Sequence, residues 1–343
     1  MAIRFKDLGL SGKLIQGLNE LGIVEPTPIQ EQVIPLLLSG DVHLVGQAQT
    51  GTGKTAAYGL PILERINPKK KQIQALILCP TRELSQQVAK QLFKFTKYTD
   101  KIFTEAVYGG EKIDIQIKNL SRPTHIVVAT PGRLIDLLGR KAIDLSHVDT
   151  VVLDEADEML SMGFKDQLDA ILTQLNQIRN KWLFSATMPF GIRQIVNQHM
   201  AEDAHRIQVS RDVVNKKIEH QFIICDDSDK LPVLLDFLRS RKEERGIIFC
   251  RTKAAASKLA KQLQAKNCAA EALQGNMLQK ERDKTMRAFK NENLRILVAT
   301  DIAARGIDVE DLSFVIHYEM PDQEAARTDK AQEREINSYT SRD

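Results

Sequence analysis

The chain has few of the features that mark secreted, zinc-binding or membrane-spanning proteins. Its four cysteines, Cys79, Cys225, Cys250 and Cys268, lie far apart and form no CxxC pair, which argues against a structural zinc site or a disulfide framework. No apolar run approaches the roughly 20 residues needed to cross a bilayer. The first residues, "MAIRFKDLGLSGKL", lack the apolar core of a signal peptide. We therefore expect a cytoplasmic protein that makes no membrane contact.

The composition is that of a globular protein without a strong charge bias. Apolar residues make up 43% of the chain and charged residues 27%, as in ordinary globular domains. A length of 343 residues is enough for two domains, each with its own core. The net charge of +3 is too small to indicate a nucleic-acid partner by itself. Evidence for function must therefore come from local motifs.

Two pairs of segments indicate an internal duplication. Thr81 and Thr130 each follow an apolar run and lie 49 residues apart, and Thr252 and Thr300 repeat the pattern 48 residues apart. The matching segments are "LILCPTRELSQQVAKQL" with "IIFCRTKAAASKLAKQL", and "IVVATPGRL" with "ILVATDIAARG". Buried parallel strands often look alike, but the nearly equal spacing favours a true repeat. Alternating strand and helix patterns in both halves predict an α/β fold with parallel sheets.

A polar stretch, "IQVSRDVVNKKIEH", is the natural boundary between the two halves. It places a first domain at residues 1–206, a linker at 207–217, a second domain at 218–320 and an atypical tail at 321–343. Ligands of such sheets bind at the carboxyl ends of the strands. The motifs that follow strands are therefore the candidates for a functional site.

A glycine-rich stretch between an apolar run and a helix start is the clearest chemical motif. "VHLVGQAQTGTGKTAAYGL" matches the phosphate-loop pattern G-x-x-x-x-G-K-[ST], except that Ala48 stands at the first glycine. Gly51 and Gly53 allow backbone N–H groups to curl around phosphate oxygens at the helix N-terminus. Lys54 is expected to reach the β- and γ-phosphates, and the Thr55 hydroxyl to bind Mg²⁺. A glycine-rich surface turn with an exposed lysine is the alternative.

An acidic motif follows another apolar run about a hundred residues later. "VDTVVLDEADEML" delivers Asp154 and Glu155 at the carboxyl end of a predicted strand. A nucleotide-hydrolysing site needs one carboxylate to hold the metal and one residue to orient the attacking water, roles that suit Asp154 and Glu155. Alone, such an acidic loop would be a solvated surface. With a phosphate loop upstream, it indicates a catalytic site that includes Lys54.

Six motifs in this order resemble those of DEAD-box ATP-dependent RNA helicases. They are "AQTGTGKT" (48–55), "PTREL" (80–84), "TPGR" (130–133), "DEAD" (154–157), "SAT" (185–187) and "ATDIAARGID" (299–308). The resemblance covers about residues 5–320 of the chain. It implies two RecA-like P-loop domains in tandem, the second incomplete at its C-terminal end, which agrees with the duplication seen in the spacing.

The resemblance implies ATP as the nucleotide and Mg²⁺ as its metal. "GIVEPTPIQ" is similar to the family's Q motif, in which the Gln30 amide would bond to the N6/N7 edge of adenine and the Phe5 ring would stack on the base. Phe5 as an ordinary core residue is the alternative. Asp308 matches a ribose contact, with Arg305 in the same loop. The nucleotide-binding set is Phe5, Gln30, Gln49, Thr50, Gly51, Thr52, Gly53, Lys54, Thr55 and Asp308.

The same resemblance assigns RNA backbone contacts to motifs in both halves. Arginines such as Arg82 and Arg133 can pair with phosphates, although singly they would be surface residues at helix starts. Contacts to phosphate and 2′-OH hold a strand without reading its sequence. The RNA-binding set is Pro80, Thr81, Arg82, Gly109, Gly110, Thr130, Pro131, Gly132, Arg133, Gly275 and Thr300. A role in coupling ATP-site closure to RNA distortion is implied for Asp157, Ser185 and Thr187.

The family pattern breaks after "FVIHYEMP". The family continues into a motif of the form H-R-x-G-R-x-x-R and a further strand and helix, and "DQEAARTDKAQEREINSYTSRD" contains neither. An arginine finger contributes about 10³ to 10⁵ in rate in comparable sites. Two explanations compete for this ending: an altered or truncated copy of a helicase, which we favour, or a natural variant that binds without cycling.

Three functions therefore stay open at the level of sequence. The first is an RNA-dependent ATPase that unwinds short RNA duplexes. The second is an ATP-dependent RNA-binding protein with little or no turnover, because the arginine motif is absent. The third is a DNA helicase, which the RNA-type motifs make less favoured. No protein partner follows from the sequence, and we expect a monomer.

Overall fold

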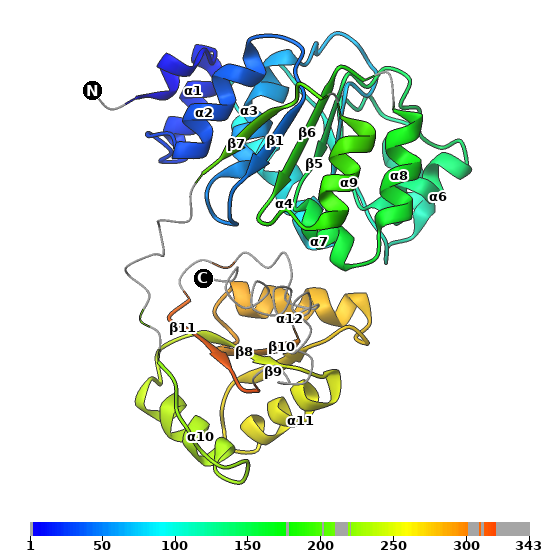
Figure 1. The fold of residues 1–343 in the computed structure, drawn as a ribbon. Helices are drawn as coiled ribbons and strands as arrows, with labels where there is room; N and C mark the ends of the chain where they lie inside the picture. The colour runs from blue at the N-terminus through cyan, green and yellow to red at the C-terminus, as the bar shows by residue number, and fades with distance from the viewer. Residues whose placement is uncertain are drawn as a thin grey trace. The chain divides into compact units, whose positions relative to one another are not determined.

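The computed structural model describes residues 3–175, 178–200, 202–209, 219, 221–300, 309 and 312–319. The chain divides into two compact units, Met1–Val213 and Val214–Asp343, each built around its own sheet (Figure 1). Of the predicted site residues, Arg305 and Asp308 lie outside the described residues, as do the tail at 321–343 and residues 210–217 of the predicted linker.

The first unit is a parallel sheet covered by helices on both faces (Figure 1). Within the described residues its strands are β1 (Leu44–Gln47), β2 (Ala75–Leu78), β3 (Thr104–Val107), β4 (Ile126–Ala129), β5 (Thr150–Leu153), β6 (Asn180–Ser185) and β7 (His205–Gln208). They lie in the order β3-β4-β2-β5-β6-β1-β7. The helices are η1 (Phe5–Leu8), α1 (Gly12–Glu20), α2 (Pro28–Leu38), α3 (Lys54–Arg65), α4 (Arg82–Phe95), α5 (Ile113–Leu120), α6 (Pro131–Gly139), α7 (Ala156–Ser161), α8 (Lys165–Gln174) and α9 (Phe190–His199).

Both faces of this sheet are apolar, because successive strand residues point to opposite sides. In β2, Ile77 packs into a core layer with α1 to α4, whereas Leu76 and Leu78 pack into a second layer with α6 to α9. Trp182 on β6, the single tryptophan of the chain, is fully buried in the first layer. The two layers fix the sheet between them, so the loops at its carboxyl edge start from a rigid base.

The second unit repeats this plan on a smaller scale. Within the described residues its strands are β8 (Gly246–Cys250), β9 (Ala270–Leu273), β10 (Ile296–Thr300) and β11 (Phe314–His317), in the order β11-β8-β10-β9. Its helices are α10 (Lys230–Ser240), α11 (Lys253–Gln264) and α12 (Gln279–Lys290). One core layer lies against α10 and α11 and the other against α12. All the strand pairs described in both units are parallel.

The two sheets correspond strand by strand. The block β3-β4-β2-β5 of the first unit has the same order and chain connections as β9-β10-β8-β11 of the second. Thr81 begins α4 with its Oγ1 accepting from the Leu84 N–H at 3.2 Å, and Thr252 begins α11 with its Oγ1 accepting from the Ala255 N–H at 3.1 Å. Threonine is a favoured helix N-cap for this reason. The prediction of two tandem α/β units with parallel sheets is confirmed.

Candidate functional site

The phosphate loop follows β1 and leads directly into α3. Gly51 and Gly53 adopt φ values of +78° and +87°, which side chains with a Cβ rarely tolerate. Within the loop, the Thr52 hydroxyl donates to the carbonyl of Gln49 at 2.7 Å. The predicted residues Gln49, Thr50 and Thr52 thus form one compact turn, whose N–H groups precede a helix N-terminus as anion binding requires.

Lys54 is buried although it carries a positive charge. Its side chain is 6% exposed, and Nζ donates to the carbonyl of Ala48 at 3.0 Å. The lysine therefore bridges the two ends of the loop. A buried ammonium is costly unless it is well paired, so this position suits a side chain that exchanges a neutral carbonyl for phosphate oxygens. Thr55 follows on the first turn of α3.

Two residues of the "PTPIQ" stretch hold the loop from the side of α2. The Thr27 hydroxyl donates to the carbonyl of Thr52 at 2.8 Å, and Gln30 Nε2 donates to the carbonyl of Gly53 at 3.0 Å. Gln30 Oε1 accepts from the Thr27 N–H at 3.0 Å, which caps α2. Gln30 is thus a brace of the phosphate loop in this structure. Its adenine contact stays a prediction, as does that of Phe5, which is 2% exposed in the first core layer.

The acidic motif begins where β5 ends. Asp154 is 2% exposed, and its Oδ2 accepts from the Tyr58 hydroxyl on α3 at 2.8 Å. Among the described residues, the buried Oδ1 has no hydrogen-bond partner. Burial raises the pKa of Asp154, opposed by the charge of Lys54 and the hydrogen bond from Tyr58. A buried carboxylate oxygen beside a phosphate loop, free of protein donors, has the chemistry of a Mg²⁺ ligand.

Glu155 stands at the turn between β5 and α7 with a left-handed backbone, φ 52°. Burial, followed by the charge of Asp154, raises the pKa of Glu155 to about 8. Neighbouring carboxylates in a poorly hydrated site resist joint ionisation. Strained backbone and shifted pKa values both concentrate at functional sites. Asp154 and Glu155 therefore have the features of a functional site in the first unit.

The predicted coupling residues are in direct contact. Asp157 Oδ2 accepts from the Thr187 N–H at 2.8 Å and from the Thr187 hydroxyl at 2.7 Å. Ser185 accepts from the Asp157 N–H at 3.3 Å and donates to the carbonyl of Thr187 at 2.6 Å. The "DEAD" and "SAT" segments are therefore joined by three hydrogen bonds at the carboxyl edge of the sheet, and the bond between Ser185 and Thr187 closes the "SAT" turn.

The predicted RNA residues of the first unit lie on three segments at that edge. Thr81 and Thr130 are the N-cap residues of α4 and α6, and Pro131 takes the first position of α6. The Arg82 guanidinium lies 4.7 Å from the ring centre of Tyr108, which precedes the Gly109–Gly110 turn. Gly132 is exposed, and a Cβ added there would meet no atom within 4 Å.

In the second unit, two of the predicted RNA residues are described. Thr300 ends β10, as Thr130 follows β4 in the first unit, and it is 6% exposed. A Cβ added at Gly275 would lie 3.2 Å from Cε of Lys253. Lys253 Nζ donates to Asn276 Oδ1 at 2.8 Å. The glycine thus allows the chain to pass close under a lysine at the start of α11.

The sequence interpretation missed several residues that contact the site. Thr27 was readable as the first residue of a Thr-x-x-Gln capping box. Tyr58 lies one helical turn after Lys54, on the same face of α3, which is a weaker signal. Gln116 lies among Ile113, Ile117 and Leu120 of α5, and a polar residue in an apolar stripe can be detected but its partners cannot.

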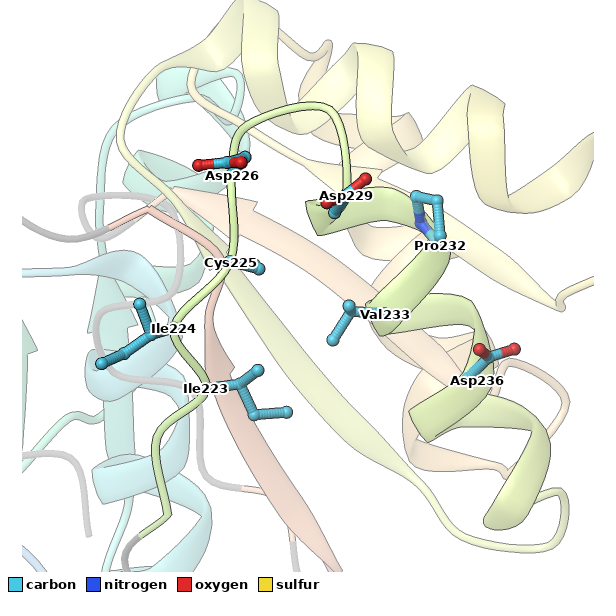
Figure 2. Close-up of a pocket in the computed structure, with 8 residues that line it drawn as sticks. All are labelled: Ile223, Ile224, Cys225, Asp226, Asp229, Pro232, Val233 and Asp236. Carbon is cyan, nitrogen blue, oxygen red and sulfur yellow. The ribbon is translucent and has the colours of Figure 1, made fainter.

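A separate pocket of about 570 Å³ lies in the second unit, between residues 223–226 and α10 (Figure 2). The pocket is lined both by apolar side chains, such as Ile223 and Val233, and by the acidic residues Asp226, Asp229 and Asp236. None of the predicted site residues lines it.

Across the described part of the chain, no group of three or more His, Cys, Asp or Glu residues is arranged to hold a metal ion. Within the same residues, no helix is both long and apolar enough to cross a membrane.

Comparisons with known protein families identify the family of this chain. The DEAD/DEAH box helicase family matches residues 27–195, and the helicase conserved C-terminal domain matches residues 229–335. The chain belongs to the DEAD-box family of ATP-dependent RNA helicases, and its two units are tandem RecA-like domains.

Two CshA helicases are among the curated relatives of the chain. The DEAD-box ATP-dependent RNA helicase CshA of Streptococcus pneumoniae (strain TIGR4) is 42% identical over 319 residues, which cover 93% of this chain and 60% of the relative. The CshA helicase of Listeria monocytogenes is 43% identical over 319 residues, covering 93% and 61%. The chain therefore spans about 60% of the length of these curated relatives.

Solved structures show the same family. A DEAD box protein from Methanococcus jannaschii is 38% identical, with a TM-score of 0.59. The match covers 99% of this chain and 88% of that protein's chain. Dbp5 of S. cerevisiae, solved bound to RNA and ADP BeF3, is 32% identical with a TM-score of 0.86, covering 98% and 84%.

Proposed function

We propose that this chain binds ATP with Mg²⁺ and hydrolyses it in response to RNA, coupling the cycle to RNA binding and local duplex unwinding. The observation that carries the proposal is the meeting of the phosphate loop with the "DEAD" carboxylates. Tyr58 on α3 donates to Asp154 at 2.8 Å, and the charge of Lys54 acts on both carboxyl groups. The names of the relatives support the same activity.

Each residue of this centre has a distinct task. Lys54 and the N–H groups of the loop bind the phosphates, and Thr55 and Asp154 are the residues that would hold Mg²⁺. The unpartnered Oδ1 of Asp154 fits that role. When bound, Mg²⁺ supplies charge neutralisation on the β- and γ-phosphate oxygens. Glu155 orients the attacking water, which requires its ionised form. Burial and the charge of Asp154 raise the pKa of Glu155, and a cation held beside the two carboxyl groups would favour the ionised form.

RNA is the proposed second ligand, held through its backbone. The helix N-termini and N-cap threonines at Thr81 and Thr130 offer N–H and hydroxyl groups suited to phosphates. The Asp157–Thr187 contact joins the "DEAD" segment of the ATP centre to the "SAT" segment, to which we assign the coupling of the two ligands. We place the activity in the cytoplasm, where the free state of the four cysteines is expected.

An RNA-stimulated ATPase assay tests the proposal. We expect ATP turnover to rise on addition of single-stranded RNA, and Lys54→Met to abolish it. ATP and RNA binding with no turnover would replace the helicase by the ATP-dependent RNA-binding alternative, which the comparisons support less than the helicase. A competition assay between RNA and DNA of the same sequence tests whether the chain is instead a DNA helicase. Absence of ATP binding with and without RNA would refute both ATP-dependent proposals.

A further inference from the structure

Gln116 on α5 is a buried polar residue that neither the motifs nor the proposed mechanism uses. Its side chain is 1% exposed. Nε2 donates to the carbonyl of Tyr108 and to Glu111 Oε2, each at 3.0 Å. Oε1 accepts from Arg133 NH1 at 2.9 Å and from the Tyr108 N–H at 3.3 Å. These four bonds use both donors and both acceptors of the amide.

The bonds of Gln116 enclose the Gly109–Gly110 turn. Tyr108 precedes the turn and Glu111 follows it, so one amide holds both of its ends. Gly110 has φ +84°, and a Cβ added at Gly109 would meet no atom within 4 Å. Two adjacent glycines have high conformational freedom when nothing restrains them. The restraint here comes from outside the turn, through Gln116.

Arg133 takes part in the same set of hydrogen bonds around the Gly109–Gly110 turn, which we call the brace. Besides its bond to Gln116, its NH2 donates to the carbonyl of Glu111 at 2.9 Å. Both terminal nitrogens of the guanidinium therefore contact protein groups, although the sequence suggested that this arginine pairs with phosphate. On the other side, Tyr108 accepts from Gln86 Nε2 at 2.7 Å, and its ring lies under the Arg82 guanidinium. Tyr108 and Gln116 thus connect the "PTREL", Gly-Gly and "TPGR" segments.

We infer that Gln116 is a positioning residue for RNA, and that Arg133 acts with it as a brace instead of as a phosphate ligand. The inference rests on the proposed RNA-binding function. The brace holds three short segments as one surface before RNA arrives, so binding does not have to order the glycine turn. It lies away from the phosphate loop, so its loss should weaken RNA binding and leave ATP binding unchanged.

The salt dependence of RNA binding distinguishes a brace from a phosphate contact. The full chain is titrated with fluorescent single-stranded RNA at several salt concentrations, for the wild type, Gln116→Leu and Arg133→Leu. We expect both variants to bind about tenfold more weakly, with the slope of log K against log[salt] unchanged. Loss of a phosphate contact would instead reduce that slope by about 0.7 for single strands. The Kd of a fluorescent ATP analogue should stay at the wild-type value.

Two further variants separate positioning from general loss of structure. Gln194→Leu removes a half-buried helical glutamine that bonds to Lys165, and it should bind RNA like the wild type. Gln116→Glu keeps the size of the side chain but places a carboxylate against Glu111, and it substitutes for Gln116→Leu if that variant does not fold. Adding Glu111→Gln to Gln116→Glu restores the bond between these two residues with donor and acceptor exchanged, and should recover part of the affinity, because the Tyr108 carbonyl still lacks its donor.

The outcomes separate this inference from the proposed function. Wild-type affinity in Gln116→Leu and Gln116→Glu, or a reduced salt slope in Arg133→Leu, would overturn the brace while RNA binding itself stands. Weaker ATP binding in parallel with weaker RNA binding would also overturn it, because the effect would then be general. A wild-type chain that binds no RNA would refute the proposed function directly.

Discussion

Glu155→Gln should make the stability of the protein without nucleotide less dependent on pH between pH 6 and pH 8. The folded-state pKa of Glu155 is raised from the model-compound value of 4.5 to about 8. The folded state therefore keeps a proton that the unfolded chain releases, and this contribution to stability is present below pH 4.5 and lost as pH rises towards 8. Between pH 6 and pH 8 the wild type should lose about 2 kcal/mol of unfolding free energy that the glutamine variant retains.

The measurement uses the single tryptophan. Trp182 is buried in the first unit, so its fluorescence during urea unfolding reports on the unit that contains Glu155. The experiment is done without nucleotide and with EDTA, because a bound cation would favour ionised carboxylates. Glu25→Gln, at an exposed glutamate of the same unit, is the matched control and should behave like the wild type. An equal loss of stability in wild type and Glu155→Gln between the two pH values would refute the argument.

Three further changes test separate parts of the structure. Lys54→Met removes the bond to the Ala48 carbonyl and the phosphate partner. Nucleotide affinity should therefore fall by a hundredfold or more in a titration with a fluorescent ATP analogue, as expected for the loss of a charged contact of about 3 kcal/mol. Thr187→Val removes the hydroxyl bond to Asp157 and should cost about 1–2 kcal/mol in the Trp182 unfolding transition; additive effects of Thr187→Val and Asp157→Asn would contradict a direct contact. Gly246→Ala places a Cβ 2.2 Å from the Phe314 ring and should destabilise the second unit by about 1–3 kcal/mol, seen by circular dichroism, while the Trp182 transition of the first unit stays unchanged.

The fold could be predicted because its signals are local and repeated. The runs that became β2, β4, β8 and β10 are apolar throughout, and each ends near a threonine that begins a helix or ends a strand. Nearly equal spacing of these threonines in the two halves predicted equivalent positions, which the matching strand orders confirm. The same signals could not give the order of strands in the sheet, because that depends on long-range pairing.

The site was predictable only where its chemistry is contiguous in sequence. The phosphate loop and the "DEAD" segment each carry their own pattern, and the structure joins them through Tyr58. Gln116 has no such pattern, because its partners come from a strand end, a turn and α6. Arg133 shows a second limit: its type suggests a phosphate partner, which stays a prediction, whereas its bonds to Gln116 and Glu111 could not be read from the sequence. A side chain's partners follow from packing, which the sequence does not state.

The charged groups of this centre favour Mg-ATP over ATP alone. Lys54 holds a neutral carbonyl, Asp154 has a buried oxygen without a donor among the described residues, and Glu155 has a raised pKa. Phosphates alone would satisfy the lysine but bring more negative charge to two carboxylates that already resist joint ionisation. A cation alone would satisfy the carboxylates but not the lysine. Only the two together match all three groups, so nucleotide affinity should fall when magnesium is removed, and Asp154→Asn should weaken that dependence.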